Sequence, residues 1–218
     1  RLIPFVLVGL PVVLVLRQPD LGTAMLIFLL FLSVMLLTKL KFRSIVTLFL
    51  VATASLPLTW SYLLKDYQKQ RIFTFLDPSS DPSGAGWQAR QSLFAIGSGG
   101  WWGKGYLKGT QNQLHFLPER WTDFPFAVWA EEWGFAGSAA LLGVYLFVIL
   151  WALKLASQAR DRFGAVLCVG VASLYFWHTV INIAMVTGMA PVVGMTLPLF
   201  SYGGSSLLST CLTLGMVQ

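Results

Sequence analysis

The sequence predicts an all-α fold: a polytopic integral membrane bundle of about six transmembrane helices with one long extracytoplasmic loop. Of the 218 residues, 56% are hydrophobic and only 11% are charged, whereas a soluble domain is about 25% charged. The apolar residues form long runs, and about 20 of them in a row cross a bilayer. Half of the charged side chains, 12 of 24, fall between residues 65 and 124. We therefore expect residues 1–218 to form a single membrane domain, with 65–124 as its large loop.

The first half of the chain contains three predicted helices. Residues 2–16 and 21–38 are apolar and are separated by Arg17-Gln-Pro-Asp20. Asp20 is placed to cap the second helix, because a carboxylate at the N-cap accepts a free backbone N–H. After a basic turn at 39–43, the third helix starts near residue 42 and crosses to 64. We expect it to continue as far as Asp77-Pro78, since a proline disfavours helix at the preceding residue.

The large loop has three predicted parts. Residues 77–86 are rich in Asp, Pro, Ser and Gly, a composition typical of turns. Residues 87–96 predict a short interfacial helix. A glycine-rich stretch follows from Gly97. The apolar face of the interfacial helix is expected to hold Trp87, Gln91, Phe94 and Ala95.

The second half contains three more predicted helices. The fourth spans 122–155, with Thr122 or Asp123 as its N-cap and Pro125 in its first turn, where the missing N–H costs nothing. The fifth spans 164–186. A loop rich in Gly and Pro, 188–204, leads to the sixth, which starts at 205.

The loop charges predict the orientation. The short turns at 39–43 and 154–162 are basic, and short basic loops mark the cytoplasmic side. The loops at 17–20, 65–124 and 188–204 are therefore expected to open outside. Both ends of the sequence lie within apolar runs, so we expect further helices beyond them, mostly before residue 1.

Composition argues against two classes of site. The net charge of +6 fits membrane orientation and anionic ligands, and it gives no support for nucleic acid as a partner. Cys168 and Cys211 lie in apolar segments, and His115 and His178 are isolated. We therefore assign no metal ligands.

Eight short motifs, spread in order along the chain, resemble the SEDS family (shape, elongation, division and sporulation). They are Gln18-Pro-Asp-Leu-Gly-Thr-Ala24, Gln91-Ser-Leu-Phe-Ala-Ile-Gly-Ser-Gly-Gly100, Gly103-Lys-Gly105, Gly109-Thr-Gln111, Leu117-Pro-Glu119, Thr122-Asp-Phe124, Glu131-Glu132 with Gly134-Phe135, and Pro198-Leu-Phe-Ser-Tyr-Gly-Gly-Ser-Ser206. The resemblance is strongest to the rod-shape branch. The chain departs from the family pattern at Trp121, Pro125 and Ala130, where His, Ile and Gly are usual.

The resemblance implies a ten-helix peptidoglycan glycosyltransferase of the bacterial cytoplasmic (inner) membrane, with its active site facing the outside. Such an enzyme polymerises lipid II and works beside a class B penicillin-binding protein, among membrane lipids. The six helices expected here would be the last six of the ten. A divalent cation, Mg²⁺ or Mn²⁺, held mainly through substrate phosphates would leave little trace in a sequence. The alternative is a lipid II flippase or transporter.

Asp123 is the predicted catalytic residue. Glycosyl transfer needs a base to take the proton of the acceptor hydroxyl, and a carboxylate beside Trp121 and Phe124 is expected to have a raised pKa. The alternative role for Asp123 is a plain helix N-cap. The resemblance favours catalysis, because the family's essential aspartate lies in the Thr-Asp-Phe motif.

Four further loop residues are predicted to serve the substrate. Lys104, Lys108 and Arg120 are candidates for binding the pyrophosphate, whose departure fixed cations assist. Their alternative is contact with lipid headgroups. Glu119 is expected to support Asp123 from four residues away. Glu131 and Glu132 lie inside an apolar helix, so we expect a buried structural pair, or a place along the substrate cavity.

Overall fold

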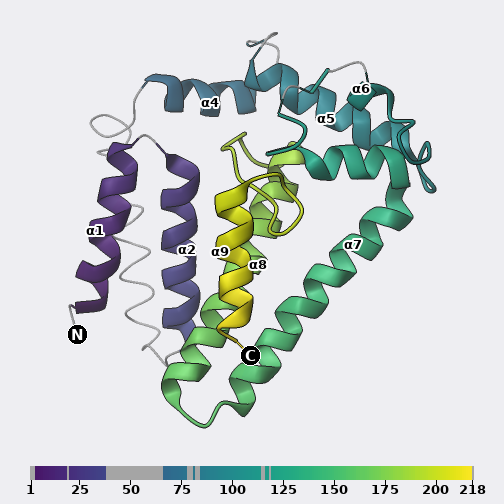
Figure 1. The fold of residues 1–218 in the computed structure, drawn as a ribbon. Coiled ribbons are helices and arrows are strands. Elements are labelled where there is room, and N and C mark those ends of the chain that lie inside the picture. The colour runs from purple at the N-terminus through teal and green to yellow at the C-terminus, as the bar shows by residue number, and fades with distance from the viewer. Residues whose placement is uncertain are drawn as a thin grey trace.

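The computed structural model describes residues 3–18, 20–37, 66–77, 81, 84–113, 116–117 and 119–217, and every regular element in these ranges is a helix (Figure 1). Helices α1 (Ile3–Arg17), α2 (Leu21–Leu37), α8 (Arg162–Val186) and α9 (Gly204–Gly215) stand side by side with the long arm of α7 (Pro125–Gln158). Helices α4 (Asp66–Leu76) and α5 (Ala85–Gly99) lie across one end of this bundle, with the short α6 (Thr110–Gln113) beside them.

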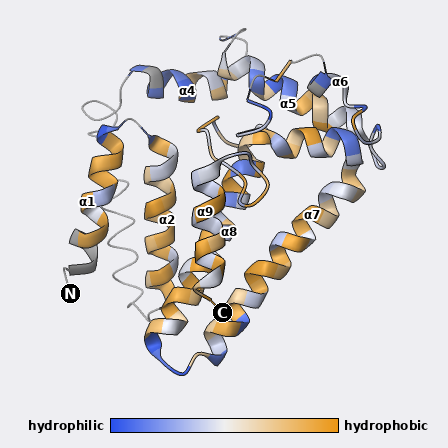
Figure 2. Ribbon diagram, in the orientation of Figure 1, coloured by the Kyte–Doolittle hydropathy of each residue, from blue (hydrophilic) through white to orange (hydrophobic). Residues whose placement is uncertain are grey.

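Hydropathy divides the molecule in the same way. Figure 2 shows apolar residues along α1, α2, α8 and the long arm of α7, and hydrophilic residues at α4, α5, α6 and the turn between α7 and α8. By length and composition, α7 and α8 can each cross a membrane, and α1 and α2 contain shorter apolar stretches. The predicted number of six crossings is not tested, since the third predicted helix, 42–64, lies outside the described residues.

Several predicted helix boundaries are confirmed. Helices α1, α2 and α8 begin and end within a few residues of the expected positions, and α9 begins at Gly204, one residue before the expected start. Asp20 caps α2 as predicted: Thr23 N donates to Asp20 Oδ1 at 3.0 Å and Thr23 Oγ1 donates to Oδ2 at 2.6 Å. Helix α4 ends at Leu76, just before Asp77-Pro78. These boundaries depend on local chemistry that the sequence displays directly.

The interfacial helix differs from its prediction in length and in facing. Helix α5 starts two residues early and extends three residues into the glycine-rich stretch, to Gly99. Phe94 is not on the same face as Gln91 and Ala95, because it is 63% exposed while they are buried. The buried face is made of small and polar residues, Gly86, Gln91, Ser92, Ala95 and Gly99. A side chain at Gly99 would collide with the carbonyl oxygen of Ala130, so the glycine permits close packing of α5 on α7.

Helix α7 differs from the predicted single segment because it is interrupted. Pro125 does occupy its first turn, as expected, but the N-cap position is Phe124 and no side chain caps it. Neither Thr122 nor Asp123 is therefore the cap. Gly134 interrupts the helix with φ 64° and ψ −161°, a backbone region that essentially only glycine adopts. The break divides α7 into a short arm, Pro125–Trp133, that lies under α5, and the long arm that descends along the bundle (Figure 1).

The hydrophobic core sits where the short arm meets α8 and the loop before α9. Phe124 and Ala127 at the start of α7 are fully buried, as is Met185 near the end of α8. Tyr145 Oη donates to the carbonyl oxygen of Pro198 at 2.5 Å. This packing fixes residues 119–124 and 191–203 close to each other at the polar end of the bundle.

Candidate functional site

The Thr122-Asp123 segment is a single tight turn. Asp123 N and Phe124 N both donate to the carbonyl oxygen of Glu119, at 3.1 and 3.2 Å. Thr122 Oγ1 donates to Glu119 Oε2 at 3.0 Å. Phe124 is buried in the core immediately after the turn. Asp123 is therefore held between an anchored aromatic residue and a second carboxylate.

Asp123 has a perturbed acidity. Its side chain is half-buried, and burial raises the pKa of Asp123 above its ordinary value, with a further rise from the negative charge of Glu119. A hydrogen bond from Thr122 and the charge of Arg71 act in the opposite direction on this pKa. A carboxylate with a raised pKa is a stronger base than an ordinary aspartate once it is deprotonated.

A buried amide in α8 fixes the backbone of Asp123. Asn182 Nδ2 donates to the carbonyl oxygen of Asp123 at 2.9 Å and to that of Met195 at 2.5 Å. Asn182 has no exposed surface. Sequence reasoning did not single out this residue. The available signal was a polar amide within an apolar helix, where a polar side chain usually has a function or a partner.

A polar pocket of about 240 Å³ lies next to Asp123. Gly194 lies in its wall with φ +72°, and a Cβ at Gly194 would be 3.4 Å from Asp123 Oδ2. The Asp123 carboxylate therefore lies close to Gly194 in the pocket wall, although Asp123 does not itself line the pocket. The lining, drawn from α2, α4 and the loop before α9, is Asp20, Leu21, Gln68, Arg71, Ile72, Pro191, Val193 and Gly194. Gln68 and Arg71 are site residues that the sequence reasoning missed, because their polar side chains resembled a solvated helix surface.

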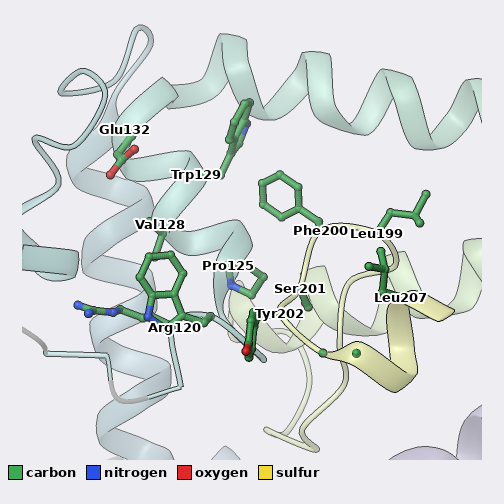
Figure 3. Close-up of a pocket in the computed structure, with 13 residues that line it drawn as sticks. Arg120, Pro125, Val128, Trp129, Glu132, Leu199, Phe200, Ser201, Tyr202 and Leu207 are labelled. Carbon is green, nitrogen blue, oxygen red and sulfur yellow. The ribbon is translucent and has the colours of Figure 1, made fainter. Parts of the chain in front are cut away.

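A second, larger pocket of about 570 Å³ is lined by Arg120 and Trp121, just before the Thr122-Asp123 turn, and by Pro125, just after it (Figure 3). Tyr202 N donates to the carbonyl oxygen of Trp121 at 2.8 Å, which ties the loop before α9 to the turn. Arg120 lies over the Trp121 ring, with its guanidinium carbon 5.0 Å from the ring centroid. The lining is mostly apolar and includes Arg120, Trp121, Pro125, Val128, Trp129, Glu132, Phe200, Tyr202 and Leu207.

The predicted site residues are only partly gathered in this region. Arg120 lines the apolar pocket and Glu119 contacts the Asp123 turn. Lys108 lies exposed on the glycine-rich loop, where its N–H donates to the carbonyl oxygen of Gly105 at 3.0 Å. Lys104 Nζ forms an ion pair of 2.7 Å with Glu131 Oε1. Both glutamates in α7 are buried, as expected, but Glu131 pairs with Lys104 and Glu132 faces the apolar pocket.

The fold and site define a class: a helical membrane protein with a half-buried aspartate near two pockets. The family model described as cell cycle protein, FtsW/RodA/SpoVE, matches residues 1–218. The chain belongs to this family, the SEDS family.

Named relatives agree with this membership. The chain is 48% identical over 216 residues to peptidoglycan glycosyltransferase MrdB of Escherichia coli K12, and the match covers 99% of this chain and 58% of that protein. It is 43% identical over 156 residues to peptidoglycan glycosyltransferase RodA of Treponema pallidum, covering 72% of this chain and 36% of that protein. The chain thus spans little more than half the length of the Escherichia coli relative.

Solved structures share the fold. One comes from a study of the structural coordination of polymerization and crosslinking by a peptidoglycan synthase complex; the TM-score is 0.81 at 35% identity, covering 98% of this chain and 59% of that one. The rod shape determining protein RodA of Thermus thermophilus gives a TM-score of 0.60 at 31% identity, covering all of this chain and 56% of that one.

Proposed function

We propose that the protein containing this chain is a peptidoglycan glycosyltransferase that polymerises lipid II during cell-wall elongation and releases undecaprenyl pyrophosphate. Family membership and the name of the Escherichia coli relative support this activity. The observation that carries the proposal is Asp123, a half-buried carboxylate of raised pKa. It lies close to Gly194 in the wall of the polar pocket, and its neighbours Trp121 and Pro125 line the apolar pocket.

Asp123 acts as the general base in this proposal. The oxygen of the acceptor hydroxyl attacks the anomeric carbon of the donor sugar while its proton passes to the Asp123 carboxylate. The bond from that carbon to the pyrophosphate oxygen breaks, and the pyrophosphate leaves with the electron pair. The polar pocket is suited to the sugar, because its carboxylate, amide and guanidinium groups both accept and donate hydrogen bonds.

The apolar pocket is suited to the polyprenyl end of the substrate. Its walls are aromatic and aliphatic, and Arg120 at its edge provides a fixed positive charge for a phosphate. We assign Arg120 and Lys108 to the leaving pyrophosphate, and Glu119 to support of Asp123. The site then opens on the outer face of the cytoplasmic membrane, where a class B penicillin-binding protein would crosslink the product. The solved synthase complex, in which polymerization and crosslinking are coordinated, supports such a partner.

The decisive experiment uses purified full-length protein with lipid II and detects glycan strands on a gel. Asp123→Asn, which keeps the size of the side chain, is expected to abolish polymerisation while the protein stays folded, with thermal stability no lower than that of the wild type. Asp66→Asn is the matched control, since Asp66 lies exposed in the first turn of α4. Near-normal turnover in Asp123→Asn would exclude this residue as the base. In liposomes, lipid II scrambling without any glycan would instead identify a flippase.

A further inference from the structure

The break in α7 is joined to the glycine-rich loop by backbone hydrogen bonds. Gly134 interrupts the helical pattern, so carbonyl groups before it and N–H groups after it lose their usual partners. Lys104 N and Gly105 N donate to the carbonyl oxygens of Glu131 and Glu132, each at 3.0 Å, and Phe135 N and Ala136 N donate to those of Gly100 and Trp101, at 2.8 and 3.1 Å. The loop thus replaces the bonds that the break removes, on both sides of it.

The close approach leaves no room for side chains at the junction. A Cβ at Gly103 would collide with the Glu132 carbonyl, and one at Gly134 would collide with Gly103 N. Gly103 and Gly134 both have positive φ, 78° and 64°. The loop and the break therefore fit each other as one unit.

An ion pair between the half-buried Lys104 and the buried Glu131 closes the same junction. Glu131 has no exposed surface. Its Oε1 accepts hydrogen bonds from Lys104 Nζ at 2.7 Å, Thr110 Oγ1 at 3.1 Å and Gln111 N at 3.1 Å. Lys104 Nζ also donates to Thr110 Oγ1 at 2.9 Å. One carboxylate oxygen thus joins the short arm of α7 to both ends of the loop that runs from Lys104 to Gln111.

We propose that Lys104 and Glu131 are positioning residues: their ion pair locks the glycine-rich loop onto the break in α7 and so sets the direction of the short arm that begins beside Asp123. Only the expected effect on kcat rests on the proposed function; the contact between loop and helix does not. Glu131 lies on the short arm, and Asp123 directly precedes that arm's first residues. A small rotation of the arm therefore moves the base relative to both pockets.

This role competes with direct phosphate binding by Lys104. An ammonium group has three donors, and Glu131 and Thr110 already accept from Lys104 Nζ. To move onto a phosphate, Lys104 would leave a fully buried carboxylate without its counter-charge, and breaking a buried pair from one side is strongly unfavourable. The geometry favours the lock.

The kinetic test compares Lys104→Met, Glu131→Gln and the double variant, with Lys154→Met as the matched control on the exposed far part of α7. A displaced base lowers kcat, so each single variant is expected to lose about 10- to 100-fold in kcat with little change in KM for lipid II. The double variant is expected to be no slower than the worse single one, because both break the same contact. If Lys104 instead binds phosphate, Lys104→Met raises KM and Glu131→Gln does not reproduce its effect, which would overturn the lock.

A second readout does not depend on activity. Hydrogen exchange at the amides of Lys104, Gly105, Phe135 and Ala136 reports the four joining bonds directly, and we expect about tenfold faster exchange there in Glu131→Gln than in the wild type. The Lys154→Met control should leave these amides unchanged. Thr110→Val, a milder change at the same junction, should show the same pattern more weakly and serves where the charge variants fail to fold. Unchanged exchange at all four amides would overturn the lock. This result does not depend on glycan synthesis, so it tests the lock even if the proposed function is wrong.

Discussion

Asn182 Nδ2 donates a hydrogen bond of 2.9 Å to the backbone carbonyl oxygen of Asp123, so a side chain from inside α8 holds the residue at the centre of the site. The same amide nitrogen donates to Met195, in the loop that carries Gly194. Asn182 thereby fixes both the proposed base and one wall of the polar pocket. Three separate segments meet at this one buried amide.

Asn182→Leu is expected to destabilise the protein by about 1–3 kcal/mol, because the carbonyl oxygens of Asp123 and Met195 lose their donor. Polymerisation should fall as well, since Asp123 loses its backbone anchor. Thermal unfolding and the lipid II assay measure the two effects. Thr179→Val is the matched control in α8, because the buried Thr179 hydroxyl makes no hydrogen bond and its loss should change little. Equal stability of the two variants would contradict the anchoring role.

The raised pKa of Asp123 predicts how activity depends on pH. The base works deprotonated, so kcat/KM should rise with pH through an apparent pKa above the ordinary 3.8. Glu119→Gln removes a negative neighbour that raises the Asp123 pKa, so the rising limb of the pH–rate profile should move to lower pH. Arg71→Gln removes a positive neighbour and should move it to higher pH. If neither variant moves the limb, another group is the base.

The raised pKa of Asp123 also predicts how the stability of the folded protein changes with pH. Because the folded protein holds the Asp123 proton more tightly than the unfolded chain, stability is fully present below about pH 3.8, the ordinary value. It is partly lost as pH rises through the raised pKa. Asp123→Asn, which cannot ionise, should therefore gain stability relative to the wild type above that pH. Denaturant unfolding of both proteins across this range, compared with Asp66→Asn, checks the direction; a loss of relative stability in Asp123→Asn as the pH rises would contradict it.

Gly134→Ala is expected to destabilise the fold by at least about 2 kcal/mol, because only glycine adopts this backbone region without strain. The added Cβ would also collide with Gly103 N. Gly143→Ala is the control in the same helix, where a Cβ would meet nothing within 4 Å, and alanine there should stabilise by about 0.5–1 kcal/mol. Thermal unfolding distinguishes the two, and a neutral Gly134→Ala would show that α7 can run straight.

The apolar pocket predicts a change in substrate affinity. Val128→Trp fills part of that pocket and should raise KM for lipid II by about tenfold, the scale of a steric mismatch in an apolar site. Val144→Trp places the same side chain on an exposed part of α7 and should leave KM unchanged. An unaltered KM in both variants would remove this pocket from the proposed substrate path.

The sequence alone determined the all-α class and most of the helix boundaries. Apolar runs, the Asp20 cap, Pro125 in the first turn of α7 and the stop before Pro78 act through neighbouring residues, so they can be read without knowing the rest of the fold. The short motifs likewise indicated the family and singled out Asp123, whose raised pKa was expected from its aromatic neighbours and agrees in direction with the structure.

Only the tertiary structure decided which distant residues contact each other. Lys104 meets Glu131 across 27 residues, and Asn182 meets Asp123 across 59. The break at Gly134 exists because a distant loop supplies the backbone bonds that the helix gives up. Such contacts depend on where the chain returns in space, and a buried charge or amide is tolerated only where that return brings it a partner. For this reason the sequence identified Lys104 and Arg120 as charged loop residues but could not show that Lys104 closes the α7 junction whereas Arg120 lines the apolar pocket.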